Sequence, residues 1–98
     1  MPYLVFSARA QADIARLYRF LAEKDIHAAA RAVVTIRDAF HPLTRSPMIG
    51  RPVEERLDLR ELVIDFGASG YLALYRFDPS TDTVAILAIK HQLEIDYK

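Results

Sequence analysis

The sequence predicts an α+β domain in which a helical hairpin packs on an antiparallel sheet, with elements in the order β-α-α-β-β-β. Apolar residues recur at helical spacing through the first half of the chain, and the pattern becomes strand-like from about residue 57. The connections between the expected elements are short, so consecutive elements must fold back on one another. These observations place the helices beside each other and the later strands in antiparallel order.

Length and composition indicate one globular domain over residues 1–98. The chain is the size of one independent core, and 52% apolar with 27% charged residues is typical of a folded protein. The 13 basic and 13 acidic residues cancel, so the whole molecule lacks the positive field that draws proteins to nucleic acid. No apolar run reaches the ~20 residues of a membrane span, and no signal-peptide pattern begins the chain. We therefore expect a cytoplasmic protein without a membrane partner.

The residue types exclude several kinds of site. The chain has no cysteine, which removes disulfides, thiol nucleophiles and cysteine-ligated zinc. Its three histidines lack the i,i+4 pairing with another ligand that a helical metal site uses, and there is no glycine-rich phosphate loop. We therefore expect neither a metal nor a cofactor.

The first half of the chain predicts one strand and two helices. Residues 3–6 are uniformly apolar, and Ser7 after them is suited to cap a helix over residues 8–24. Asp25 is suited to cap a second helix, which ends or kinks at His41 because the following proline disfavours helical geometry there. The break between the two helices is so tight that they form an antiparallel hairpin.

Three strands are expected in the second half, over residues 57–66, 71–77 and 83–91, separated by the turns GASG and DPSTD. If the first turn has four residues, Phe66 lies opposite Tyr71, and the register then predicts a cross-strand ion pair of Glu61 with Arg76.

The same register, with Phe77 opposite Thr83, assigns the side chains to two faces of the sheet. One face carries Arg60, Leu62, Ile64, Phe66, Tyr71, Tyr75, Phe77, Leu87, Ile89 and His91. The other carries Glu61, Val63, Leu72, Leu74, Arg76, Val84, Ile86 and Lys90. Both faces are substantially apolar, and the helical hairpin can cover only one of them. The sequence therefore predicts a partner on the second face.

Four segments resemble the RelE/ParE superfamily of toxins from bacterial toxin–antitoxin modules. In order along the chain they are SPMIGRP, LRELVIDF, GYLALYRFD and VAILAIKH. Members of this superfamily carry a Pro-x-x-Gly-Arg loop, a Leu-Arg strand, a Tyr-Arg strand and a last strand that ends in His. The resemblance spans nearly the whole chain, and the long helical hairpin with the MIGRP loop is more similar to the ParE branch, whose sequences are often labelled plasmid-stabilisation proteins.

The resemblance implies a toxin that arrests growth by inhibiting DNA gyrase and is neutralised by a cognate antitoxin. It also implies that the antitoxin carries a ribbon-helix-helix domain, covers the second sheet face and the hairpin, and makes the only contact with DNA. A fold does not decide between activities. The alternatives are a RelE-like ribosome-dependent mRNA endoribonuclease and an inactive remnant that binds only the antitoxin.

A ParE-like toxin needs no catalytic residue, whereas RNA cleavage needs a base, an acid and cations for the phosphate. If the chain is RelE-like, its catalytic candidates, considered together with Lys90, are Arg60, Arg76, His91 and Tyr97. The predicted register splits them, because Arg60 and His91 lie on one face and Arg76 on the other.

The residues also have structural interpretations. We expect His91 to be a hydrogen-bonding residue at a strand end, and Tyr97 to anchor a tail that packs back through Leu93 and Ile95. Candidates for contacting a partner are Arg51, Arg60, Tyr71, Tyr75 and His91. The target, the antitoxin stoichiometry and the oligomeric state are not encoded in any local motif.

Overall fold

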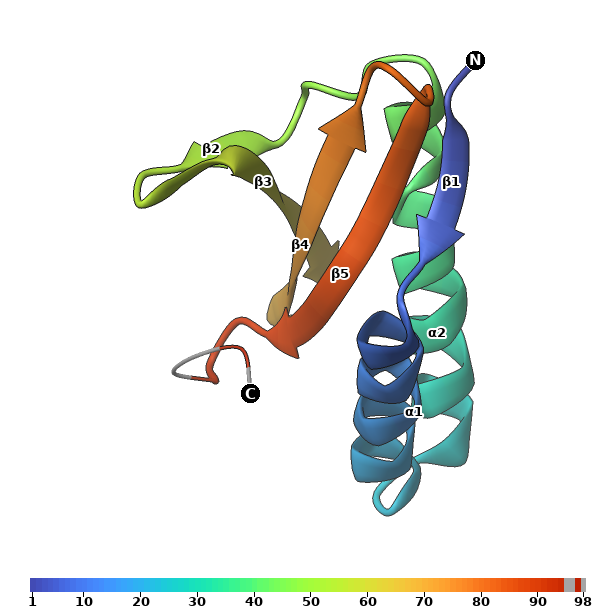
Figure 1. Ribbon diagram of the computed structural model, residues 1–98. Coiled ribbons are helices and arrows are strands. Elements are labelled where there is room, and N and C mark those ends of the chain that lie inside the picture. Colours follow the sequence, from blue (N-terminus) through green and yellow to red (C-terminus); the bar gives the residue numbers. More distant parts are fainter. Residues whose placement is uncertain (95–96, 98) are drawn as a thin grey trace.

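The computed structural model describes residues 1–94 and Tyr97, and it confirms the α+β class. Its elements, in chain order, are β1 (Tyr3–Phe6), α1 (Ala8–Ala22), α2 (Ile26–Ala39), the 3-10 turn η1 (His41–Thr44), β2 (Arg51–Val53), β3 (Arg56–Phe66), β4 (Ser69–Asp78) and β5 (Thr83–His91). Both helices lie on the same side of the sheet, and β2 with the first part of β3 curves away from them (Figure 1).

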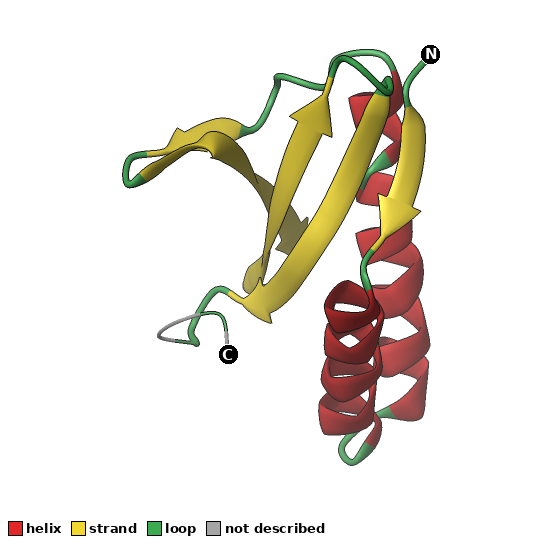
Figure 2. Ribbon diagram, in the orientation of Figure 1, coloured by secondary structure: helices red, strands yellow, loops and turns green. Residues whose placement is uncertain are grey.

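The five strands are ordered β1-β5-β4-β3-β2, and the sheet is mixed (Figure 2). The strands of the second half are antiparallel neighbours as predicted, while β1 pairs parallel to β5. β2 was expected to be part of a loop. It has only three residues and contains Pro52, so its sequence carries no strand pattern.

Local capping chemistry sets the starts of the helices. Ser7 Oγ accepts a hydrogen bond from Ala10 N at 3.0 Å, and Asp25 Oδ1 accepts from His27 N at 3.0 Å and from Ala28 N at 3.1 Å. Both caps are at the residues that the sequence predicts. α2 ends at Ala39, and the chain continues through Pro42 as η1, because proline cannot extend the α-helical hydrogen bonds.

The predicted register between β3 and β4 was wrong by two residues. Phe66 pairs with Ser69, so the turn has two residues instead of four, and Gly67 supplies the left-handed backbone with φ of 63°. A shift of two keeps every side chain on its face but changes each partner. Glu61 therefore lies opposite Leu74, and the predicted ion pair of Glu61 with Arg76 does not form.

A β-bulge between β4 and β5 overturns part of the face assignment. Tyr75 pairs with Ile86 and Leu74 with Ala88, which leaves Leu87 as the extra residue. The bulge places both Ile86 and Ile89 in the core, although residues three apart cannot share a face of a regular strand. The prediction that Val84 and Ile86 lie on the second face, and Leu87 on the first, was wrong for this reason.

The core lies between the helical hairpin and the sheet. Its fully buried side chains include, as the largest, Tyr75, Phe40, Ile36, Leu43, Ile86, Ile89 and Val84. The alanines at 29 and 32 in α2 are buried and let that helix approach its neighbours closely. Within residues 1–94 and 97, no helix is long and apolar enough to cross a membrane.

Candidate functional site

The loop before β2, residues 45–50, is held by two side chains of the sheet. Tyr75 Oη donates to Pro47 O at 2.8 Å and accepts from Gly50 N at 2.8 Å. Arg60 Nη1 donates to Met48 O at 3.0 Å and to Gly50 O at 2.7 Å. Arg60 and Tyr75 are paired across β3 and β4, so both reach the loop from one place on the sheet. These four hydrogen bonds define what we call the loop clamp.

The loop clamp depends on burial and on a missing side chain. Tyr75 is fully buried, and burial raises the pKa of its hydroxyl, so the group remains a donor. Gly50 lies against the same ring, and a Cβ atom there would stand 2.6 Å from the tyrosine oxygen. This glycine is needed for a close approach between backbone and ring. The partner candidates Arg60 and Tyr75 therefore act on the loop of their own chain.

Arg51 and Tyr97 meet at one carboxylate on the second face of the sheet. Arg51 Nε donates to Glu61 Oε1 at 3.0 Å, and Tyr97 Oη donates to Glu61 Oε2 at 2.6 Å. Lys90 Nζ stands 5.3 Å from the centre of the Tyr97 ring. Burial alone would raise the pKa of Glu61, but the bonds from Tyr97 and Arg51 outweigh it and hold this pKa below its usual value.

The tail is anchored through Tyr97, as expected, but not in the expected way. Leu93 is 80% exposed, so the prediction that it packs back was wrong. Ile95 lies outside the described residues. Tyr97 rests over the second face, whose exposed and half-buried apolar side chains include Val63, Leu72 and Leu74. The chain's own tail thus reaches a face that the helices leave open.

His91 has both ring nitrogens in hydrogen-bond contacts. Its Nδ1 accepts from Leu93 N at 3.1 Å, so Nε2, assigned from this network, carries the proton of the neutral ring toward Ser69 Oγ at 3.0 Å. The ring also stands edge-on to Tyr71, with 5.5 Å between centroids. Lys90 points to the other face, toward Glu94 O at 2.9 Å. His91 therefore lies at the end of β5 with both ring nitrogens in contacts within the chain.

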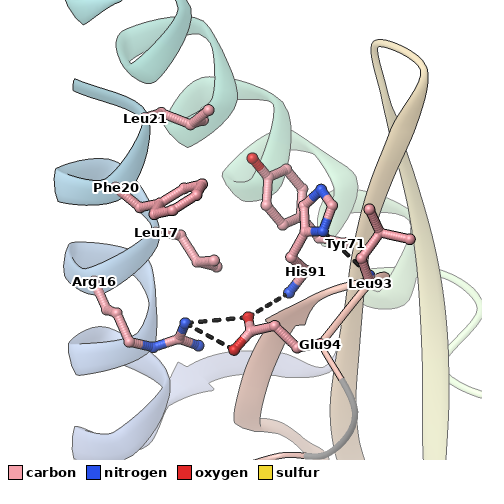
Figure 3. Close-up of a pocket in the computed structure, with 8 residues that line it drawn as sticks. All are labelled: Arg16, Leu17, Phe20, Leu21, Tyr71, His91, Leu93 and Glu94. Atoms are coloured by element: carbon pink, nitrogen blue, oxygen red, sulfur yellow. Dashed lines mark hydrogen bonds and ion pairs between the residues drawn. The ribbon is translucent and has the colours of Figure 1, made fainter. Parts of the chain in front are cut away.

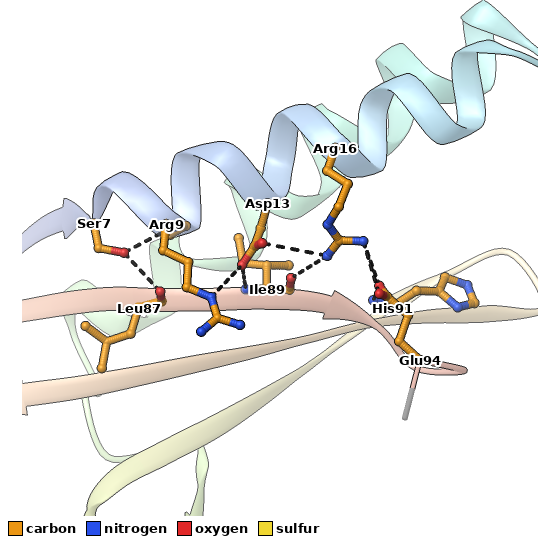
Figure 4. A network of polar contacts seen from close by, with 9 residues as sticks. Ser7, Arg9, Asp13, Arg16, Leu87, Ile89, His91 and Glu94 are labelled. Carbon is orange, nitrogen blue, oxygen red and sulfur yellow. Dashed lines mark hydrogen bonds and ion pairs between the residues drawn. The ribbon is translucent and has the colours of Figure 1, made fainter. Parts of the chain in front are cut away.

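Side chains of α1 and of its N-cap, Ser7, complete the outer edge of β5, a feature that the sequence analysis missed (Figure 4). β1 ends opposite Ile86, so the rest of that edge has no neighbouring strand. Ser7 Oγ donates to Leu87 O at 2.9 Å, Asp13 Oδ2 accepts from Ile89 N at 2.9 Å, and Arg16 Nη2 donates to Ile89 O at 3.3 Å. These groups satisfy backbone atoms that a longer β1 would have paired.

Three charged residues of α1, together with Glu94 of the tail, form the second part of this network. Asp13 is buried and lies 3.8 Å from Arg9 and 3.7 Å from Arg16. Arg16 Nη1 donates to both carboxylate oxygens of Glu94 at 3.1 Å. The i,i+4 and i,i+3 spacing of the α1 residues was the available sequence signal. It identifies the cluster but not its partners on β5.

A groove opens between α1 and the ends of β4 and β5 (Figure 3). Its volume is about 540 Å³, and its walls are Arg16, Leu17, Phe20, Leu21, Tyr71, His91, Leu93 and Glu94. Figure 3 shows Phe20 and Leu21 facing Tyr71 and His91 across it. Exposed apolar side chains at the rim, with the Arg16–Glu94 pair at one end, make it suited to an amphipathic peptide.

The catalytic candidates are not gathered into one site. Arg60 pairs with Tyr75 and His91 with Tyr71, four residues apart along β4, or roughly 13 Å at the rise of a strand. Tyr97 lies on the opposite face with Lys90. Arg76 is exposed opposite Ala85. Among residues 1–94 and 97, no group of three or more side chains is placed to hold a metal ion.

Comparison with known proteins gives a consistent result. A family model described as "ParE toxin of type II toxin-antitoxin system, parDE" matches residues 4–96. Toxin RelE3 of Caulobacter vibrioides is 37% identical over 86 residues, covering 88% of this chain and 89% of that protein.

Solved structures agree with the fold. The chromosomal ParDE toxin–antitoxin system from P. aeruginosa matches with a TM-score of 0.76 at 24% identity, covering 93% of this chain and 96% of that one. The RelBE2 toxin–antitoxin complex from Mycobacterium tuberculosis matches with a TM-score of 0.62 at 29% identity, covering 94% and 100%.

Proposed function

We propose that this chain, which belongs to the ParE toxin family of type II toxin–antitoxin systems, arrests growth by binding and inhibiting DNA gyrase, without cleaving RNA itself. One observation supports this choice of target: the side chains that RNA cleavage would require lie apart from one another. Arg60 is engaged with two loop carbonyls, and both nitrogens of His91 are in contacts within the chain.

The charge distribution supports a protein target. Arg51 is paired with Glu61 and Arg16 with Glu94. The chain as a whole has a net charge of zero, so it offers no general attraction for the phosphates of RNA. A toxin that acts by docking on an enzyme needs a complementary surface instead of a positive field.

The cognate antitoxin is proposed to occupy the groove beside α1 and the open part of the second sheet face. The groove's apolar rim, Phe20 and Leu93, would take apolar side chains of an extended or helical segment. A ribbon-helix-helix domain in the antitoxin would contact operator DNA, so this chain would reach DNA only indirectly. The pair would act in the cytoplasm and, when plasmid-borne, would stabilise the plasmid.

Gyrase supercoiling with purified components tests the target. Increasing amounts of the toxin are added to gyrase and relaxed plasmid with ATP, and to gyrase and supercoiled plasmid to detect cleaved complexes. We expect loss of supercoiling and accumulation of cleaved DNA. Unchanged supercoiling at toxin excess, without cleaved complex, would rule gyrase out.

A RelE-like activity is the second candidate, and the curated relative named RelE3 is the observation that favours it. It predicts new mRNA 5′ ends near the ribosomal A-site codon, detectable by primer extension on a translated message. Loss of those ends in His91→Ala and Arg60→Ala, with unchanged melting temperatures, would assign both residues to the reaction. Absence of any cleavage, together with gyrase inhibition, would exclude it.

A further inference from the structure

The loop before β2 holds two apolar side chains in solvent. Met48 is 55% exposed and Ile49 is 52% exposed, although the backbone on both sides of them is fixed. Mobile loops tolerate such residues easily, because their side chains can fold back onto the surface. Here the loop clamp fixes the backbone that carries them, so both side chains project from an ordered loop.

The clamp preorganises this loop for binding. Tyr75 bonds Pro47 O and Gly50 N, the two residues that flank the exposed pair, and Arg60 bonds Met48 O. A loop that is already ordered loses little conformational entropy when a partner binds it. Within the loop, Ile49 N also donates to Ser46 O at 3.2 Å, which closes the turn from the other side.

The chemistry around the loop selects the class of partner. Arg60 is engaged with loop carbonyls, and Arg51 with the Glu61 carboxylate. Arg60 is thus occupied within the chain, and Glu61 offsets the charge of Arg51, whose side chain is 61% exposed. The loop also presents the thioether of Met48 and the branched side chain of Ile49 to solvent, and these groups fit an apolar pocket on a protein.

Resting on the proposed function, we infer that Met48 and Ile49 form the surface that enters an apolar pocket of the target enzyme. The loop lies between η1 and β2 (Figure 1). None of its residues lines the groove beside α1 that is proposed for the antitoxin. Tyr75 and Arg60 act as positioning residues, because they hold the loop through its backbone atoms.

The test compares Met48→Ser/Ile49→Ser with a matched control, Ile26→Ser/Val34→Ser. The control removes two apolar side chains of similar exposure, 58% and 57%, from α2, which contributes nothing to the groove or the loop. Both variants change only exposed positions, so we expect melting temperatures close to that of the wild type. Three measurements are made on each: the concentration that halves gyrase supercoiling, growth arrest on induction, and neutralisation by the co-expressed antitoxin from the neighbouring gene.

We expect the loop variant to need on the order of tenfold more protein to halve supercoiling and to lose growth arrest. We expect it to keep binding the antitoxin, and the control to match the wild type in supercoiling inhibition and growth arrest. A loop variant that inhibits and arrests as well as the wild type overturns the inference, and so does one that loses only neutralisation, because the loop would then belong to the antitoxin interface.

The outcome is separable from the proposed target. If the wild type arrests growth without affecting gyrase, gyrase is excluded, yet loss of arrest in the loop variant still supports a target-facing loop. If the wild type neither arrests growth nor inhibits gyrase, the inference falls with the proposed function.

A double-mutant cycle tests the positioning role of Tyr75. Tyr75→Phe keeps the ring and removes both hydroxyl bonds to the loop. We expect a several-fold weaker inhibition in the native loop and no further weakening in the Met48→Ser/Ile49→Ser background. An equal loss in both backgrounds would indicate a general structural effect and would overturn the positioning role.

Discussion

The two ends of β4 are stabilised by different chemistry. Near its C-terminal end, a buried neutral hydroxyl and one arginine hold a loop through backbone atoms. At its other end, the groove beside Tyr71 has the partly exposed ion pair of Arg16 with Glu94 at one end. The hydrogen bonds of the buried neutral hydroxyl respond little to salt, whereas partly exposed ion pairs are screened by it. We therefore expect the interactions at the loop end to keep their strength as salt rises, and the ion pair at the groove end to weaken.

The largest expected effect is at the loop end. Gly50→Ala places a Cβ atom 2.6 Å from the Tyr75 oxygen, so the ring must move and its two bonds must lengthen. Overpacking with loss of buried hydrogen bonds should cost about 2–3 kcal/mol of unfolding free energy, measured by urea denaturation. Gly67→Asn is the control, because the space around Gly67 is open and asparagine tolerates its left-handed backbone. Equal stability of both variants would contradict the tight contact at Gly50.

Among the charged residues near the groove, Asp13 of α1 should contribute most to the free energy of unfolding. Asp13→Ala leaves Ile89 N on β5 without its acceptor, and the expected loss is about 1.5–2 kcal/mol. Arg9→Ala should cost less than about 0.5 kcal/mol, because Arg9 is half exposed and stands 3.8 Å from Asp13. Amide hydrogen exchange at Ile89, faster in Asp13→Ala only, locates the effect. A loss of the same size in Arg9→Ala would show that charge, and not the edge of β5, dominates.

Glu61 adds a pH dependence on the second face. Its pKa in the folded chain is lowered from the ordinary 4.5, so its interactions stabilise the fold above that value. That contribution is lost as pH falls below about 4.5 through the lowered folded pKa. Glu61→Gln should therefore show a smaller drop in unfolding free energy between pH 7 and acidic pH than the wild type, measured by urea denaturation. Parallel pH profiles would mean that Arg51 and Tyr97 do not stabilise the carboxylate.

The smallest effect is expected for the ion pair that closes the groove. Glu94→Gln should cost less than about 1 kcal/mol at low salt, because the Arg16 side chain is 38% exposed. The difference from the wild type should shrink in 1 M NaCl, whereas that of Gly50→Ala should not. A salt-independent cost for Glu94→Gln would remove the contrast between the two ends of β4.

Sequence reasoning located most elements but not the contacts of the site. Arg51 and Tyr97 were each singled out from the sequence. Glu61, the carboxylate that binds both, was predicted to pair with Arg76 instead. Arg51 was the one candidate chosen from the expected loop, while Met48 and Ile49 were passed over. Their exposure was not predictable, because in a single sequence an apolar residue in a turn looks the same whether it is buried or presented to solvent.

What the sequence alone determined is local. The helix caps at Ser7 and Asp25, the end of α2 before Pro42 and the antiparallel order of β3 to β5 follow from interactions within a few residues, which any fold of this chain must respect. The resemblance to ParE-like toxins added the family, which the comparisons confirm.

Only the tertiary structure decided the register, the bulge at Leu87 and the partners of the polar side chains. Registers two residues apart present the same faces, so the hydrophobic pattern cannot choose between them. The choice is made by a two-residue turn at Gly67, by α1 side chains that complete the edge of β5, and by Tyr75 meeting a backbone 25 residues away.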